Sequence, residues 1–159
     1  MSTRTILTYP APCLREVAKP VAEVTRETGR LVTDLLETMY STTGCGLAAP
    51  QIGVSLRVFV LHRIFSEELA GLVFINPEIL EKHGEVFCTE GCLSFPGVYQ
   101  QVARAERVKV KALNRRGKPF ELEASGLFAV AIQHENDHLD GVLMIDRLGA
   151  EPPPHASQS

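Results

Sequence analysis

The chain of 159 residues is long enough for one domain with a buried core. Hydrophobic residues make up 45% of it and charged residues 22%, which is ordinary for a soluble globular protein. The formal net charge of −3 argues against a dominant nucleic-acid surface. The sequence has no apolar run of the roughly 18 residues that a membrane span needs, and its first residues form no signal-peptide core. We therefore expect a cytoplasmic protein.

The first strongly patterned segment is residues 25–40. Its apolar residues, among them Leu31, Leu35 and Met39, recur at helical spacing and predict a packed amphipathic helix. Before it, residues 6–19 indicate an extended entry followed by a short helical turn. Nothing in this helix is of a catalytic type, so its predicted role is to fill the core.

Runs rich in β-branched and aromatic residues predict the strands. Residues 56–61 and 72–75 are expected to form a hairpin, which Asn76-Pro77 ends. A further strand is expected within residues 79–89, before the segment that contains Cys92. The remaining predicted elements are a strand at 98–102, a strand at 107–114 with a turn at 115–117 and a return at 120–123, and a short strand or turn at 142–145. We expect one domain over residues 1–148 and a flexible Pro-rich tail over 149–159.

The segment that carries chemistry is His134-Glu135-Asn136-Asp137-His138. Residues four apart on a helix lie on one face, so the two histidines can grip one metal ion. In the order His-Glu-x-x-His, the acid can serve as general base for a water that the metal activates. The same pattern can also arise by chance on a charged surface helix.

The residues around this motif favour a helix that presents the histidines on its buried face. One stripe at helical spacing contains Leu127, Val130, Ala131, His134 and His138. Ser125 is a candidate N-cap, and Gly141 is a candidate C-terminal stop.

Two histidines leave the metal shell incomplete, because a catalytic site of this kind takes three protein ligands. One metalloprotease pattern places a third histidine at the position that Met144 occupies here. A Pro-rich tail follows Leu148, so we expect the third ligand upstream. Cys92 is the best candidate, because a thiolate binds zinc and iron alike.

The four cysteines are more consistent with free thiols or metal ligation than with disulfides in a chain without a leader. Cys88 and Cys92 could together form a pair of metal ligands, although an open site needs only one of them.

Three segments together resemble the polypeptide deformylase family. They match its motifs G-x-G-x-A-A-x-Q, E-G-C-L-S and Q-H-E-x-D-H, in order, at Gly44 to Gln51, Glu90 to Ser94 and Gln133 to His138. The similarity covers roughly residues 5–148. The resemblance implies an α+β fold, a single domain with antiparallel or mixed sheets packed around a late metal-binding helix.

The resemblance also implies the reaction, a metal-dependent hydrolysis that removes the formyl group from the N-terminal formyl-methionine of new polypeptides. Its metal shell would be Cys92, His134 and His138 around Fe²⁺, with Zn²⁺, Ni²⁺ or Co²⁺ as substitutes. By the family's pattern, Glu135 is the general acid and base, and Gln51 with the backbone N–H of Leu93 stabilises the oxyanion. Gly46 would contact the substrate backbone. The walls of the methionine pocket would be Cys45, Cys88, Leu127, Val130 and Ala131.

The chain departs from the familiar pattern at three places. Asn136 stands where an apolar residue is expected, and Tyr99 stands where some relatives carry arginine. The chain also stops soon after Leu148, whereas bacterial relatives often continue into a basic helix that docks on the ribosome. A ribosome contact is therefore a weakened expectation.

Two other functions remain open on the sequence. A metallopeptidase could use the same His-Glu-x-x-His chemistry, although Cys92 as a ligand counts against it. A non-catalytic relative could bind metal or peptide, although intact Glu135 and Gln51 count against that.

Overall fold

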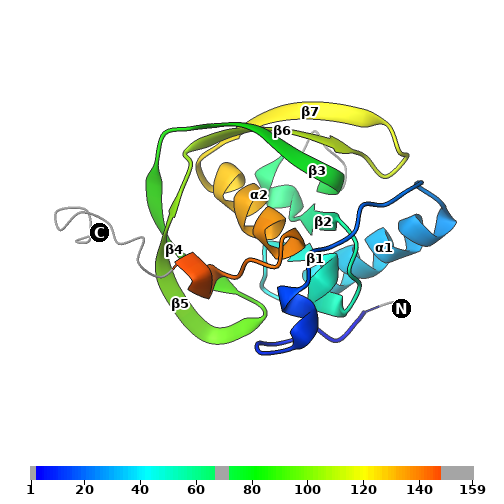
Figure 1. Cartoon of the computed structure of the whole chain (residues 1–159), viewed down its shortest axis with the longest axis horizontal. Coiled ribbons are helices and arrows are strands. Elements are labelled where there is room, and N and C mark those ends of the chain that lie inside the picture. Colours follow the sequence, from blue (N-terminus) through cyan, green and yellow to red (C-terminus); the bar gives the residue numbers. More distant parts are fainter. Residues whose placement is uncertain (1–2, 67–71, 148–159) are drawn as a thin grey trace.

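The computed structural model describes residues 3–66 and 72–147, which form an α+β fold as predicted (Figure 1). Its helices are α1 (Arg26–Tyr40) and α2 (Gly126–Leu139). The strands are β1 (Gly46–Ala48), β2 (Val58–Leu61), β3 (Leu72–His83), β4 (Val86–Cys92), β5 (Phe95–Arg104), β6 (Arg107–Leu113) and β7 (Pro119–Ser125). Short 3-10 turns are η1 (Pro12–Arg15), η2 (Ala49–Ile52), η3 (Arg63–Phe65) and η4 (Met144–Arg147). The predicted tail lies outside the described residues, so the domain boundary stays a prediction.

The strands form two antiparallel sheets. Five of them pair in the order β1-β2-β3-β6-β7, and β4 pairs with β5 alone. In the view of Figure 1, strands β3, β6 and β7 curve over the top of α2. The β4–β5 ribbon curves around the left and lower side of the same helix. Helix α2 is thus surrounded by strands, which is the arrangement that can bury a polar site.

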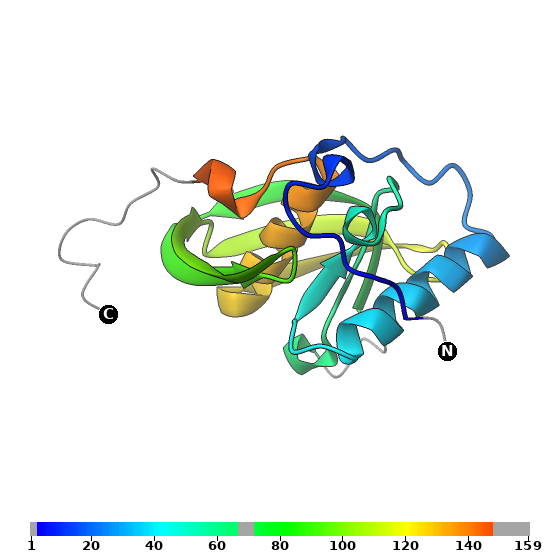
Figure 2. The ribbon, with the colours of Figure 1, turned by 90° about the horizontal axis from the view of Figure 1, so that it is seen from below.

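The fully buried strand β2 separates two cores. Successive side chains of a strand point to opposite faces. Phe59 and Leu61 pack in the cluster that contains residues of α2, whereas Val58 and Val60 pack in the cluster that contains residues of α1. Seen from below, α1 runs diagonally past β1 and β2, away from α2 (Figure 2). The continuous apolar sequence of β2 is therefore explained by a helix on each face.

Helix α1 occupies the segment whose spacing predicted a helix. Thr25 precedes its first turn, and the backbone N–H of Thr25 donates a 3.0 Å hydrogen bond to Oγ1 of Thr28. This bond satisfies a donor at the helix start. Leu31, Leu35 and Met39 are buried against the β1–β2 side of the sheet.

Strand β3 does not end at Asn76-Pro77, so that part of the prediction is wrong. Its pairing with β2 does stop at Ile75, but the strand then bulges and continues along β6 to His83. Asn76 has a positive φ of 51°, and its side-chain amide exchanges two hydrogen bonds with the backbone of Val21. Pro77 has no N–H to lose, so it can sit at a bulge without breaking the strand.

Other predicted boundaries also shift. The strand expected within residues 79–89 is in fact two strands, because the chain turns at Gly84, whose φ is 73°. The strand expected at 98–102 is part of the longer β5. The segment at 142–145, expected to be a strand or a turn, leads into the 3-10 turn η4. The predicted hairpin of β6 and β7 is present, with Lys111 opposite Glu121.

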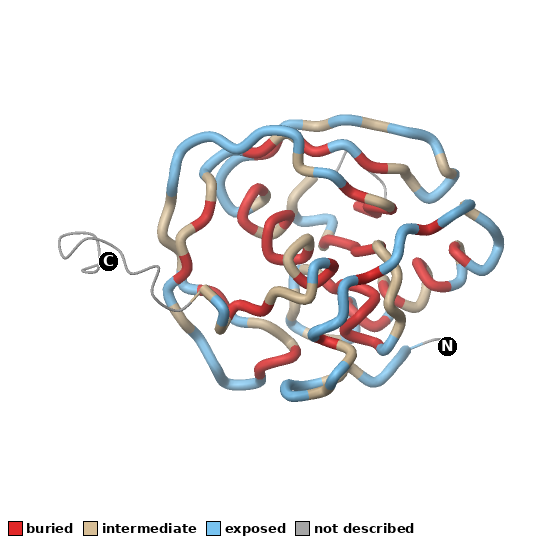
Figure 3. Tube along the Cα trace, viewed as in Figure 1, coloured by how far each residue is buried: buried red, intermediate tan, exposed pale blue. Residues whose placement is uncertain are grey.

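Helix α2 is among the most deeply buried elements, as the red tube at the centre of Figure 3 shows. Ala129, Ile132 and Leu139 pack into the cluster that contains Phe59 and Phe74, whose rings stack with centroids 4.7 Å apart. In the described part of the chain, no helix is long and apolar enough to span a membrane.

The chain turns sharply after α2 at Gly141. Its φ is 70°, and a Cβ added there would lie 2.5 Å from the carbonyl oxygen of Arg15. Glycine is therefore required both for the left-handed conformation and for this close approach. The turn sends the chain back past the N-terminal segment into η4.

Candidate active site

Three predicted metal ligands converge from two elements. Cys92 ends β4, and His134 and His138 share one face of α2. Their ligand atoms all lie within 4.8 Å of one another, and Sγ of Cys92 is 3.3 Å from Nε2 of His138. A thiolate with two imidazoles is a donor set for zinc and other late first-row divalent ions. These residues form a group that can hold a metal ion.

Glu90 orients the ring of His134 through a hydrogen bond at Nδ1. Its Oε1 lies 2.9 Å from Nδ1 of His134. Burial raises the pKa of Glu90, but hydrogen bonds from Arg104 and His134 outweigh it and bring the pKa to about 2. An ionised carboxylate can only accept, so Nδ1 of His134 donates its proton to Glu90 and Nε2 is the nitrogen left for a metal. Burial lowers the pKa of His134, but hydrogen bonds with Cys92 and Glu90 outweigh it and raise the pKa to about 10, so a metal would have to displace the Nε2 proton.

His138 also fits the role of a ligand. Burial lowers its pKa well below the ordinary value, so the ring is neutral, as a metal ligand must be. Its Nδ1 is buried and has no hydrogen-bond partner among the described residues.

Arg104 links two acidic side chains inside the protein. Its side chain is 3% exposed, and its Nε and Nη2 each donate to Glu90 at 2.8 Å. Its Nη1 donates to Oδ2 of Asp137 at 2.6 Å. Burial lowers the pKa of Arg104, but the bonds to Glu90 more than compensate and leave it above its ordinary value. The carboxylate of Glu90 is therefore held by two hydrogen bonds from a permanently charged guanidinium group.

Glu135 is buried with one unsatisfied oxygen. Its side chain lines a cavity, and its Oε1 has no partner among the described residues. Burial raises the pKa of Glu135 to about 7. A Cβ at Gly46 would lie 2.8 Å from Oε2 of Glu135, so the second glycine of the motif leaves room for this carboxylate. A carboxyl group with this pKa can both take and return a proton near neutral pH.

Gln51 is fixed with its amide nitrogen toward the metal ligands. Its Oε1 accepts the backbone N–H of Ala48 at 2.9 Å, which settles the orientation of the amide. Its Nε2 donates to Oγ of Ser94 at 3.1 Å and lies 3.7 Å from Sγ of Cys92. The side chain is 1% exposed, so this donor is held in place before any substrate arrives.

A cavity of about 430 Å³ opens beside these groups. Most of the predicted site residues line it, namely Cys45, Gly46, Gln51, Cys92, Leu93, Leu127, Val130, Ala131, His134 and Glu135. A larger open groove of about 1390 Å³ follows α1, but none of these residues lines it. The smaller cavity is the one that adjoins the chemistry.

Two predicted wall residues differ from expectation. Leu127 does line the cavity, but its side chain is 71% exposed, so it does not continue the buried stripe of α2. It lies in the first turn of the helix, where the strands no longer cover it. Cys88 is not among the described residues that line the cavity. Burial raises the pKa of Cys88, and the charge of Glu90 raises it further.

Several residues of the site were not singled out from the sequence. Glu90 could have been found, because it lies two positions before Cys92, and the two share a face if the strand expected within residues 79–89 continues to Cys92, as β4 does. Arg104 and Ile64 had no such signal, because they approach through pairing and packing of distant segments. Ile64 lines the mouth of the cavity and is 73% exposed.

Comparison with known proteins agrees with this geometry. The model of the polypeptide deformylase family matches residues 3–152. The chain belongs to this family. The peptide deformylase of Alkalilimnicola ehrlichii is 53% identical over 148 residues, covering 93% of this chain and 83% of that protein. That of Neisseria gonorrhoeae is 51% identical over 148 residues, covering 93% and 88%.

Solved deformylase structures share the fold. The peptide deformylase of Legionella pneumophila superposes with a TM-score of 0.88 at 47% identity, covering 97% of this chain and 88% of that one. That of Thermotoga maritima gives 0.88 at 41% identity, covering 96% and 100%. The chain is thus an amide hydrolase that removes the N-formyl group from newly made polypeptides and releases formate. This family assignment decides against the metallopeptidase and the non-catalytic relative.

The buried Glu90–Arg104 pair gives a prediction for stability. Glu90→Gln should lower the free energy of unfolding by about 3–5 kcal/mol near neutral pH, because it breaks a buried ion pair. The folded-state pKa of about 2 lies below the ordinary 4.5, so Glu90 stabilises the fold above about pH 4.5 and loses this effect as the pH falls toward 2. The difference between wild type and variant should shrink over that interval.

Urea unfolding at stepped pH, with chelator present throughout, measures this difference. Glu81→Gln is the matched control, because its half-exposed carboxylate should contribute little. A difference that stayed constant from pH 7 to pH 2 would contradict the assignment.

Proposed function

We propose that Cys92, His134 and His138 hold one catalytic Fe²⁺, for which Zn²⁺, Ni²⁺ or Co²⁺ can substitute. The observation that carries this proposal is the convergence of the three ligand atoms within 4.8 Å. Glu90 accepts the proton of Nδ1 of His134 and so directs Nε2 to the metal, which would displace the second proton of that ring. The ring of His138 is already neutral, as a ligand must be. When bound, the ion acts as a Lewis acid on the attacking water and on the formyl carbonyl.

Glu135 is the proton carrier in this proposal. Its carboxylate lines the cavity and has one oxygen without a partner among the described residues, so it can take the proton of the attacking water. The pKa of about 7, raised by burial, allows the same carboxyl group to pass that proton to the leaving amine. The two transfers complete the hydrolysis without a second acid.

Gln51 and the backbone N–H of Leu93 stabilise the negative charge that develops on the formyl oxygen. The amide of Gln51 is locked by Ala48 and Ser94, so it needs little reorganisation. Losing one donor of this kind typically costs roughly 10²–10³ in rate. Gly46 lines the same cavity, so its backbone can contact the substrate there.

The cavity takes the methionine side chain. Cys45, Leu127, Val130 and Ala131 supply apolar walls, and His134 lies at its inner end. Methionine suits such a cavity because it is flexible and polarizable. Cys88 as a further wall, the cytoplasmic location and a contact with the ribosome remain predictions.

The metal assignment predicts the metal content of single variants. Cys92→Ala, His134→Ala and His138→Ala should each lose most of the bound metal, because two ligands hold an ion poorly. Cys88→Ala, on the same strand, is the control and should retain it. Elemental analysis of the purified proteins decides the matter. Full occupancy in Cys92→Ala together with an empty Cys88→Ala would refute the assignment.

The role of Glu135 predicts a loss of turnover without a loss of metal. Glu135→Gln should lower kcat by roughly 10²–10⁴, because glutamine cannot accept the proton. Glu123→Gln changes an exposed carboxylate on β7 and should leave kcat unchanged. Kinetics with a formyl-Met peptide and metal analysis are run on both. Near wild-type kcat in Glu135→Gln would make this carboxylate a structural group.

The cavity predicts substrate choice. Ala131→Phe should raise KM for formyl-Met peptides roughly tenfold or more through overpacking, with metal content intact. Ala22→Phe, an exposed site away from the cavity, is the control and should leave KM unchanged. Formyl-Asp peptides should be poor substrates of the wild type, because an apolar pocket gives a carboxylate no partner. Equal kcat/KM for formyl-Met and formyl-Asp peptides would rule out this pocket.

A further inference from the structure

We propose that Arg147 is a positioning residue of this active site: through Asp137 and Arg104 it fixes Glu90 and so the ring of His134. The inference rests on the proposed function of His134 as a metal ligand. It assigns a role at the reaction centre to a residue of the C-terminal turn η4.

A continuous set of charged contacts connects Arg147 to His134. Arg147 holds Asp137 from the side, with Nη2 2.9 Å from Oδ1 and Nε 3.2 Å from Oδ2. Nη1 of Arg104 reaches Oδ2 of the same carboxylate at 2.6 Å. The other edge of the Arg104 guanidinium holds Glu90 with two bonds of 2.8 Å, and Glu90 contacts His134 at 2.9 Å.

The geometry of these contacts explains why the contact between Arg147 and Asp137 matters for His134. A guanidinium that holds a carboxylate with two parallel bonds fixes its plane as well as its distance. Arg147 holds Asp137 with two such bonds, and Arg104 holds Glu90 with two. A single bond from Arg104 to Asp137 connects the two pairs. Without Arg147, one contact to Arg104 is left to hold the plane of the Asp137 carboxylate.

Burial makes the charge balance of this set important. Glu90, Arg104 and Asp137 have side chains that are 7%, 3% and 13% exposed. Two carboxylates and two guanidinium groups are balanced, and only the side chain of Arg147, which is 40% exposed, is substantially screened by water. Removal of Arg147 leaves the buried Glu90 and Asp137 to share Arg104. Interactions between such groups are stronger in this setting than in water.

The molecule also has room for the set to rearrange. A polar cavity of about 400 Å³ adjoins it and is lined by Arg104, Asp137 and Arg147, among others. Without the two hydrogen bonds from Arg147, the carboxylate of Asp137 could turn into this cavity. The guanidinium group of Arg104 would then lose its contact with Asp137, and its position against Glu90 would be less constrained.

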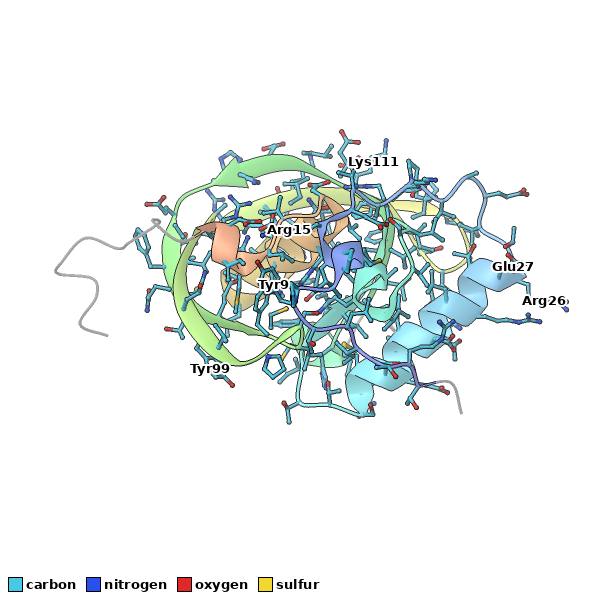
Figure 4. The ribbon with its side chains drawn as sticks, turned by 60° about the horizontal axis from the view of Figure 1, so that its bottom comes forward. Tyr9, Arg15, Arg26, Glu27, Tyr99 and Lys111 are labelled. Atoms are coloured by element: carbon cyan, nitrogen blue, oxygen red, sulfur yellow. The ribbon has the colours of Figure 1, made fainter. Side chains whose placement is uncertain are left out.

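Contacts other than those of Arg147 also hold η4 in place. Leu143 and Met144 pack in a buried cluster with Leu14 and Phe95. Asp146 accepts the backbone N–H of Leu143 at 2.8 Å and pairs with Arg15. Figure 4 shows Arg15 and Tyr9 on the N-terminal segment beside this turn. The turn is thus anchored by contacts that do not lead to His134.

The experiment compares Arg147→Met, Arg147→Lys and Arg15→Met in the Co²⁺-loaded full-length protein. Arg147→Met keeps a long apolar stem and removes both contacts to Asp137. Arg15→Met breaks the other ion pair of η4 and is the matched control. The readouts are kcat and KM for a formyl-Met peptide, the rate of Co²⁺ release to a chelator, the visible Co²⁺ spectrum and the thermal midpoint.

Arg147→Met should lower kcat and speed Co²⁺ release by about 3- to 10-fold each, with KM within about twofold. This is less than the roughly 10- to 100-fold typical of groups that touch a ligand directly. Its visible spectrum should differ from wild type. Arg147→Lys, with a single ammonium, should lie between the two, and Arg15→Met should match wild type in all but the thermal midpoint.

Wild-type kcat and release rate in Arg147→Met would overturn the proposal, as would equal losses in Arg15→Met. If Arg147→Met does not fold, Arg147→Lys decides by the same readouts. Failure of the underlying function is seen separately in the wild type: no Co²⁺-dependent turnover, or an unchanged Co²⁺ spectrum in Cys92→Ala, would refute the metal site itself.

Discussion

The buried guanidinium of Arg104 is the constraint on which the site depends. It comes from the end of β5, holds Glu90 of β4 and reaches Asp137 of α2. Three elements that meet only in the folded protein are thereby fixed relative to one another. Removing charges from water offsets much of the attraction between them, but breaking the set leaves a buried charge unpaired and is costly, so the set holds its members in one arrangement. Cys92 and His134 each lie close to a member of this set, and their separation follows from it.

Small residues complete the site from the opposite side. The Gly44-Cys45-Gly46 segment approaches Leu93 and Glu135 so closely that a Cβ at either glycine would lie under 3 Å from one of them. Gln51, a few residues later, then reaches Cys92, one of the proposed metal ligands, from the same segment. The reacting groups are therefore packed between two backbone segments, and this packing keeps Glu135 away from bulk water and raises its pKa.

Much of the fold and of the candidate site could be predicted where the sequence pattern is local. The helices α1 and α2 and the hairpin of β6 and β7 have strong periodicity, and the two histidines follow from spacing along a helix. For the third ligand, the sequence favoured Cys92 but left a Cys88–Cys92 pair open, and the resemblance implied Cys92 alone. Asn76-Pro77 was misjudged because a strand can change partners at a bulge, and Leu127 because helix periodicity does not show where the covering strands stop. Arg104 was missed, since its two carboxylates lie 14 and 33 residues away along the chain.

The convergence of ligands from β4 and α2 has a consequence for the folding of the chain. Cys92 and His138 are 46 residues apart in sequence. An ion bound between them closes a long loop much as a covalent cross-link would, and it removes conformational freedom that the unfolded chain would otherwise have. Because the ligands are assembled only in the folded state, binding shifts the folding equilibrium by mass action. Metal supply in the cell would then determine how much of this protein persists as well as how much of it is active.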